Sequence, residues 1–201
     1  SAYHRTTDLR NCETHIVDDG SSAPTQKYLD HFVKVNSDFR LHRNQKNLGK
    51  PKSINRIMRD NQNADYFTVI DGDMKILTKN WDKLLLKAHR IFKGQAILGG
   101  MTHQYGFEFK KDGMTFGDTF PFWTLAGGFF SIPKFVFKRL GYFYDRLQRH
   151  EDAEYCRRAA TQSIKWYYTP AIRTQELPHT SFSRKQEYQR LKKKEEAAYS
   201  K

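Results

Sequence analysis

Hydrophobic positions along the chain recur in two alternating spacings, one typical of strands and one typical of helices. Tyr66–Ile70 is a short run of aromatic, β-branched and aliphatic residues, which predicts a strand covered on both faces. Ile54, Ile57 and Met58 share one helical face, and Pro51 suits the first turn of that helix. The same reasoning predicts strands over Thr14–Val17, Phe39–His42, Ala96–Gly100 and Lys165–Tyr168, and helices over Pro24–Val35, Trp81–Phe92, Pro133–Leu140 and His150–Thr161.

The alternation of strands and helices predicts an α/β domain with a mostly parallel central sheet flanked by helices. The length of 201 residues suits one such domain, or one domain with a tail. Residues Phe107–Phe122 have no stable period and contain Gly113 and Gly117, so we expect a hairpin or a flexible loop over a site.

The formal net charge of +13 creates a field that attracts phosphates, acidic polymers and anionic lipid. Part of the excess lies in Arg184–Lys201, which predicts a solvated basic helix, with binding to nucleic acid, membrane or a partner as alternatives. No run approaches the roughly 20 apolar residues of a membrane span. Cys12 and Cys156 are too far apart in sequence to signal a zinc site or a disulfide framework, so a reducing, cytoplasmic location is expected.

Two predicted strands end in pairs of carboxylates. Asp18 and Asp19 follow the first strand, and Asp71 and Asp73 follow Tyr66–Ile70. In open α/β sheets, ligands bind outside the carboxyl ends of the strands. An Asp-Gly-Asp turn offers two hard oxygen ligands suited to Mg²⁺ or Mn²⁺, although Asp and Gly also share many ordinary turns.

A third pair of acids, Glu151 and Asp152, opens a predicted helix. Acids are favoured in a first helical turn by the helix dipole alone. The functional alternative is a general base, because a carboxylate beside an acceptor hydroxyl removes its proton during displacement.

Four ordered motifs lie between about residue 12 and residue 160. Residues 16–22 read IVDDGSS, which resembles the VDDGSS segment of family 2 glycosyltransferases with the GT-A fold. Asn47–Lys50, with Ser53 and Asn55, resembles its N-x-G-x…A-x-N stretch, and Asp71–Asp73 lies where the family has its DXD motif. Further along the chain, the family has GG, GxFDE, ED and R elements in that order. The residues that resemble them here are Gly127–Gly128, Gly141–Asp145, Glu151–Asp152 and Arg157.

The resemblance implies a donor site for a nucleotide sugar. Asp19 would hold the nucleobase, Asp71 the ribose or a metal-bound water, and Asp73 a Mn²⁺ or Mg²⁺ ion that bridges the diphosphate. Lys50 would contact the base or a phosphate. The implied donor residues are Asp18, Asp19, Lys50, Asp71, Gly127, Gly128, Tyr3 and Trp123, and the implied metal ligands are Asp71, Asp73 and His179.

The resemblance also implies the reacting groups. Asp152 would be the catalytic base of an inverting transfer, and Glu151 would orient hydroxyls of the acceptor or donor. Gly127 and Gly128 would let backbone amides come close to the sugar.

Three of these candidates have ordinary alternatives. Trp123 and the nearby Phe120, Phe122, Phe129 and Phe130 offer a stacking surface for a sugar or base, or simply core. His179 lies where some family members place a histidine that ligates the metal or lines the donor site, and otherwise it is a surface histidine in a Pro-containing loop. His150, next to Glu151, has the same two interpretations.

The amino end departs from the family pattern. Ser1–Arg5, with Leu9, resembles the turn and helix start that follow the family's first strand. Too few residues remain before Thr14 for the usual helix, and the first strand itself is missing. A chain that lacks this strand is expected to leave its neighbours with open edges.

The sequence thus predicts a metal-dependent, inverting hexosyl- or pentosyltransferase that uses a nucleotide sugar, with UDP favoured. The expected domain covers residues 1–180, with a donor-binding half at 1–100 and an acceptor-binding half at 101–180, followed by the tail at 181–201. The acceptor is open: a glycan, lipid carrier, small molecule, protein or hydroxylated DNA base. A basic nucleic-acid-binding domain is a non-catalytic alternative, and nucleotidyl transfer is disfavoured because no glycine-rich basic loop follows the first strand.

Overall fold

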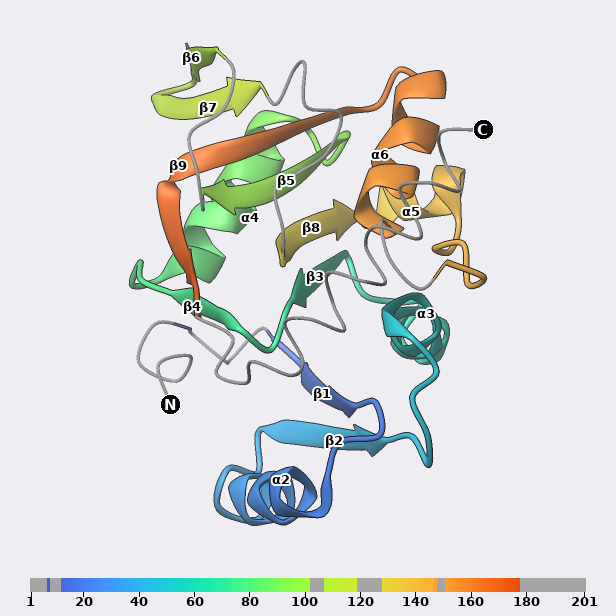
Figure 1. The fold of residues 1–201 in the computed structure, drawn as a ribbon. Coiled ribbons are helices and arrows are strands. Elements are labelled where there is room, and N and C mark those ends of the chain that lie inside the picture. The colour runs from blue at the N-terminus through green and yellow to red at the C-terminus, as the bar shows by residue number, and fades with distance from the viewer. Residues whose placement is uncertain (1–6, 8–11, 102–106, 119–127, 148–150, 178–201) are drawn as a thin grey trace.

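A computed structural model describes residues 7, 12–101, 107–118, 128–147 and 151–177 (Figure 1). None of the helices in these ranges has both the length and the apolar character needed to span a bilayer. The strands are β1 (Thr14–Asp18), β2 (Phe39–Arg43), β3 (Tyr66–Ile70), β4 (Met74–Ile76), β5 (Ala96–Met101), β6 (Glu108–Lys111), β7 (Met114–Asp118), β8 (Phe129–Pro133) and β9 (Lys165–Glu176), and the helices are α2 (Ala23–Val35), α3 (Lys50–Asp60), α4 (Trp81–Ile91), α5 (Lys134–Leu140) and α6 (Glu151–Thr161).

The larger of two sheets has the strand order β3-β8-β5-β9-β7-β6, and β4 pairs with the far end of β9. β3 and β5 are both antiparallel to β8, while β5 and β9 pair in parallel. The predicted α/β class is confirmed. The predicted mostly parallel sheet is wrong, because β8 enters between β3 and β5 in the opposite direction and β4, β6 and β7 add further antiparallel pairs.

The predicted hairpin is present as β6 and β7. Asp112 and Gly113 join the two strands with φ of 47° and 75°, and positive φ at both central residues is typical of a tight hairpin turn. A loop over a site would need residues 119–122, which lie outside the described residues.

β1 and β2 form a separate, parallel two-stranded sheet. α2 packs on this pair through Phe32, whose ring meets that of Phe39 edge-on at 5.1 Å between centroids, yet no residue of α2 is fully buried. Within the described ranges, β1 pairs only with β2 and β3 pairs only with β8. Among the described residues, each therefore has one edge on which no strand pairs.

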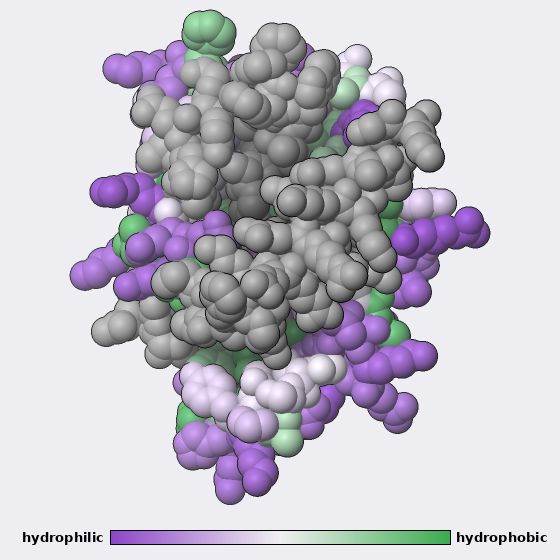
Figure 2. Space-filling view, in the orientation of Figure 1, coloured by the Kyte–Doolittle hydropathy of each residue, from purple (hydrophilic) through white to green (hydrophobic). Residues whose placement is uncertain are grey.

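The core lies on both faces of the larger sheet. Neighbouring residues of a strand face opposite sides, so Ile97 and Phe130 join one hydrophobic cluster while Leu98 and Phe129 join the other. Helices α3, α5 and α6 cover the first cluster and α4 covers the second. Phe129 and Phe130 are 1% and 4% exposed, so they are core residues rather than a stacking surface. Hydrophilic side chains predominate around the visible described surface (Figure 2).

Three differences from the predicted elements concern strands. β3 has the predicted bounds and packs on both faces, since Val69 contacts the first cluster and Ile70 the second, but it lies at the edge of its sheet and Thr68 is exposed. β9 runs on past Pro170 to Glu176. β4 and β8 were not predicted.

Candidate functional site

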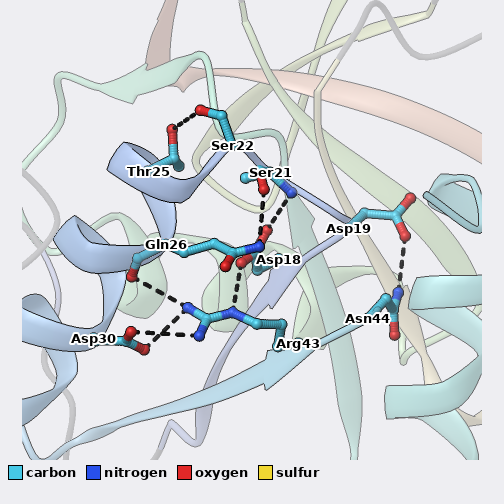
Figure 3. Close-up of polar contacts among 9 residues, drawn as sticks. All are labelled: Asp18, Asp19, Ser21, Ser22, Thr25, Gln26, Asp30, Arg43 and Asn44. Atoms are coloured by element: carbon cyan, nitrogen blue, oxygen red, sulfur yellow. Dashed lines mark hydrogen bonds and ion pairs between the residues drawn. The ribbon is translucent and has the colours of Figure 1, made fainter. Parts of the chain in front are cut away.

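Asp18 and Asp19, at the end of β1, have different surroundings. Asp18 is 1% exposed, and its two oxygens accept hydrogen bonds from the Ser21 amide and the Arg43 Nε, both at 2.8 Å. Burial alone raises the pKa of Asp18, but the Ser21 amide and the Arg43 guanidinium outweigh it, so the pKa is lowered. Arg43 also binds Asp30 of α2 (Figure 3). Asp18 therefore holds the loop after β1 through Ser21 and is linked to α2 through Arg43.

Asp19 holds the segment between β2 and α3. Its Oδ1 accepts hydrogen bonds from the Asn44 Nδ2 (Figure 3) and the Leu48 amide, both at 2.8 Å, and its Oδ2 accepts one from the Gly49 amide at 2.9 Å. A carboxylate oxygen accepts two hydrogen bonds, so Oδ2 has capacity for a second donor. Asp19 thus shapes this segment and keeps one acceptor position for a ligand.

The loop after β1 approaches this segment closely at Gly20. The φ of Gly20 is +81°, and a Cβ at this position would lie 2.7 Å from the backbone nitrogen of Asn47. Only glycine permits both the conformation and the contact. The conformation of this loop and its contact with Asn47 therefore require the glycine of the IVDDGSS segment.

Lys50, the first residue of α3, joins the ends of three elements. Its Nζ lies 2.6 Å from Asp71 Oδ1, after β3, and 2.9 Å from Glu151 Oε1, at the start of α6. The ammonium also lies 5.9 Å from the centroid of the Phe130 ring, within the range of a cation–π contact. The sequence did not predict that Lys50 would contact either acid.

The charge of Lys50 follows from these neighbours. Burial alone lowers the pKa of its ammonium, but the carboxylates of Asp71 and Glu151 outweigh that effect, so the pKa is raised. Lys50 is therefore positively charged at neutral pH. Glu151 is 6% exposed, and without this ion pair it would be a carboxylate buried without a counter-charge, which is costly.

The turn that contains Asp71 and Asp73 is fixed by backbone contacts on both sides. The Asp71 amide donates to the Gly128 carbonyl at 2.6 Å, and the Leu177 amide donates to the Asp73 carbonyl at 2.7 Å. Gly128 has φ of +60°, and a Cβ there would lie 2.5 Å from Met74 Cγ and 3.1 Å from Asp71 Cβ. The starts and ends of distant strands therefore set the position of this turn.

Asp152 differs from its neighbour Glu151. It is partly exposed, and its Oδ1 accepts a hydrogen bond from the Ala153 amide at 2.7 Å. Both acids lie in the first turn of α6, where the helix dipole favours negative charge. One turn thus supplies a buried carboxylate paired with Lys50 and a second carboxylate that remains accessible.

A divalent metal fits the chemistry of Asp71 and Asp73. Among the described residues, no group of three or more His, Cys, Asp or Glu side chains is arranged to hold a metal ion. Mg²⁺ is usually bound through one or two carboxylates together with substrate phosphates and water, rather than by a cage of protein ligands. Two aspartates on one turn match that pattern, and the third candidate ligand, His179, lies outside the described residues.

Several other predicted positions also lie outside the described residues. They are Tyr3, Phe120, Phe122, Trp123, Gly127, His150 and the basic tail at 181–201.

Asn55 is a site-shaping residue whose contacts the sequence did not reveal. It is 3% exposed, its Nδ2 donates to the Phe143 carbonyl at 2.8 Å, and its Oδ1 accepts from the Phe143 amide at 2.9 Å. This pairing joins α3 to the Gly141–Asp145 segment that leads towards α6. Its place in the N-x-G-x…A-x-N stretch was the available signal.

Arg158, rather than Arg157, supports the same segment. Its guanidinium donates to the carbonyls of Leu140 and Tyr142 at 2.6 and 2.9 Å and pairs with Glu154. Arg157 is exposed. The sequence analysis gave Arg157 no role beyond its place in the motif, and it missed Arg158.

The structure thus shows an α/β domain with pairs of carboxylates after β1 and after β3. Residues 2–139 match the model of glycosyl transferase family 2. This match covers more than half of the chain, and the chain belongs to that family. No curated protein matches it.

Solved structures of similar fold confirm the GT-A architecture. GalNAc-T7 with UDP, GalNAc and Mn²⁺ has a TM-score of 0.66 at 16% identity, covering 83% of this chain and 38% of that chain. The mannosyltransferase PcManGT from Pyrobaculum calidifontis, in complex with GDP-Man and Mn²⁺, has a TM-score of 0.62 at 13% identity, covering 85% and 49%. For S. aureus TarS in complex with UDP-GlcNAc the values are 0.61 and 15%, covering 87% and 52%. The chain thus spans about half or less of the length of these proteins.

Proposed function

We propose that this protein transfers a sugar from a nucleotide sugar, with UDP as the preferred nucleotide, to an acceptor hydroxyl, with metal assistance and inversion at the sugar carbon. The observation that carries the proposal is the convergence of Asp71, Lys50 and Glu151 at the carboxyl end of β3, next to Asp152. Mn²⁺ and nucleotides in similar structures support it.

The donor would lie across the ends of β1 and β3. Asp19 Oδ2 would accept a hydrogen bond from the nucleobase, and Asp71 and Asp73 would face the ribose and the diphosphate. Gly128 keeps the backbone after β3 close to this position. A divalent ion held by these aspartates would supply positive charge for the leaving diphosphate.

Asp152 would act on the acceptor. Its carboxylate takes the proton of the acceptor hydroxyl as the new carbon–oxygen bond forms and the bond from the sugar to the diphosphate breaks. Attack on the face opposite the leaving group inverts the sugar carbon. Glu151, held by Lys50, would orient a hydroxyl of the acceptor or the sugar.

The proposed roles of the two halves of the domain follow the order of the elements along the chain. Asp19, Lys50 and Asp71 come from the half at 1–100, and Asp152 comes from the half at 101–180. We propose that the first half binds the donor and the second half presents the acceptor, with the tail at 181–201 outside the catalytic domain.

Ligand-dependent unfolding tests the donor assignment. Adding UDP and Mn²⁺ together should raise the melting temperature, because a ligand that binds only the folded state stabilises it. GDP and single-stranded and double-stranded DNA serve as comparison ligands. Stabilisation by DNA but not by either nucleotide would favour the basic nucleic-acid-binding alternative.

A donor screen tests the reaction itself. UDP-sugars and GDP-sugars are incubated with Mn²⁺ and pooled glycans, lipid carriers, small molecules, proteins and hydroxymethylated DNA, and the released nucleoside diphosphate is measured. Release that depends on both a particular sugar and a particular pool would identify the substrates. No release with any pair would contradict the proposal.

A further inference from the structure

Lys50 places a positive charge at the position where the proposed function requires a metal. Its Nζ contacts Asp71 Oδ1 at 2.6 Å and Oδ2 at 2.9 Å, so both oxygens of this carboxylate face the ammonium. Asp71 is one of the two aspartates that suit a divalent ion. A divalent ion that bound Asp71 would therefore lie close to the ammonium of Lys50.

The ammonium also has a second anchor on a different element. Glu151 lies 2.9 Å from the same nitrogen and is nearly buried, with 8% of its side chain exposed. Lys50 and Asp71 are about equally exposed, at 30% and 31% of their side chains. The Asp71 side of the ammonium is therefore the side that a ligand from solvent can reach, while the Glu151 side is closed.

Removing Lys50 from Asp71 changes the charge balance of the site. A lysine ammonium is a compact cation with three donors, so it can exchange one carboxylate for another anion. A divalent ion alone offers Lys50 no new partner and adds repulsion between two cations. A nucleoside diphosphate brings phosphate oxygens that can take the place of Asp71.

We propose that Lys50 is an internal counter-ion that competes with the metal for Asp71, so that a divalent metal binds tightly only together with a nucleoside diphosphate. The inference rests on the proposed function and adds the order in which the metal and the nucleotide bind. Before the donor arrives, Lys50 neutralises Asp71 and Glu151. When metal and diphosphate arrive together, Lys50 leaves Asp71, contacts a phosphate oxygen and keeps its contact with Glu151.

The test measures Mn²⁺ affinity without any nucleotide, by titration calorimetry and by electron paramagnetic resonance of free Mn²⁺. Lys50→Met should bind Mn²⁺ alone at least about fivefold more tightly than the wild type, the lower end of typical coupling between sites. Saturating UDP should raise Mn²⁺ affinity strongly in the wild type and much less in Lys50→Met.

Two further variants separate this role from simpler ones. Lys52→Met removes the same charge from an exposed position of the same helix and should leave the affinity for Mn²⁺ alone close to that of the wild type. Lys50→Arg keeps the charge and should keep weak binding of Mn²⁺ alone. Should Lys50→Met fail to fold, Lys50→Gln removes the charge while keeping donors for both carboxylates.

The outcomes are distinct from those that test the transferase activity. Unchanged or weaker Mn²⁺ binding by Lys50→Met would overturn the counter-ion proposal, as would equal gains in Lys50→Met and Lys52→Met, or no Mn²⁺ binding by any of these proteins. A wild type that binds no nucleotide and no nucleotide sugar would instead contradict the proposed function, and the Mn²⁺ comparison would still be decided.

Discussion

The two acids of each neighbouring pair differ in their burial and in their contacts, and the sequence alone does not show these differences. Asp18 is buried and bound to Ser21 and Arg43, whereas Asp19 is partly exposed and its Oδ2 keeps one acceptor position. Glu151 is buried against Lys50, whereas Asp152 is partly exposed. In each pair, one carboxylate is buried in an ion pair and its neighbour is partly exposed.

Asp152→Asn tests the proposed base. The amide has nearly the same shape but cannot take a proton, so turnover should fall by about a hundredfold or more, the lower end of general-base contributions. Affinity for UDP with Mn²⁺, measured by calorimetry, should change by less than about twofold, because the proposal assigns Asp152 to the acceptor and not to the donor. The exposed Asp38→Asn is the control. Equal losses of turnover and nucleotide affinity would contradict the assignment.

Asn55→Ala tests the support of the segment before α6. The change leaves the buried amide and carbonyl of Phe143 without their side-chain partner, and each such group costs about 1–3 kcal/mol. Urea unfolding should therefore show a loss of about 2–6 kcal/mol. Asn63→Ala, at an exposed position, should cost less than about 0.5 kcal/mol; a similar loss in both variants would argue against the pairing.

Sequence alone predicted Asp71 and Glu151 as site residues but not the lysine that joins them. Asp71 follows from the end of a strand, and Glu151 follows from the motif order. The ion pairs of Lys50 could not be predicted, since they depend on how far α3 and α6 stand from β3. The contacts of Arg158 with the carbonyls of Leu140 and Tyr142 had no signal in the motifs either.

At the scale of elements, helices were easier to predict than strands. α2, α4 and α6 follow the predicted ranges to within a residue at either end, because a helix is stabilised by contacts within its own sequence. β4 is three residues long and exists through pairing with β9, about a hundred positions later. β8 is buried at all five positions, so it lacks the alternation that distinguishes a half-exposed strand from a buried aromatic cluster.

Gly128→Ala tests the contact between the start of β8 and the turn after β3. The new Cβ would lie 2.5 Å from Met74 Cγ and 3.1 Å from Asp71 Cβ, so the turn must move. Affinity for UDP with Mn²⁺ should fall by about tenfold or more, since small displacements in a site are costly.

Gly113→Ala is the matched control for this change. Gly113 has a similar φ of +75°, but nothing lies within 4 Å of its Cβ position. The substitution should therefore cost only the backbone strain of about 1–2 kcal/mol and leave nucleotide affinity unchanged. Equal affinities of the two variants would show that Gly128 does not position Asp71.

At the scale of the whole molecule, acid should destabilise the fold through His89. This side chain is fully buried between α4 and the sheet, with Nε2 2.9 Å from Ser131 Oγ, and burial lowers its pKa from 6.5 to about 3. The unfolded chain therefore binds a proton that the folded chain excludes between these values. The stability from neutral His89 is present above pH 6.5 and is lost as the pH falls towards 3, by about 1.4 kcal/mol per unit.

His89→Gln isolates this contribution. The amide can still bond to Ser131 but does not titrate. Between pH 7 and pH 5, the free energy of unfolding of the wild type should fall by about 2 kcal/mol more than that of the variant. Denaturant unfolding at both pH values gives the difference, and identical pH dependence would show that His89 is not buried in its neutral form.

The separation of the fold into two sheets has a consequence for the order in which a growing chain becomes structured. β1, α2 and β2 make their contacts within a short span, so this unit can form soon after its residues leave the ribosome. The larger sheet must wait, because β3 pairs with β8 and the Asn55 side chain meets Phe143 across 88 positions. Asp71 is synthesised early, but its ion pair with Lys50 is joined by Glu151 only after α6 has been synthesised. The site is therefore completed among the last parts of the domain.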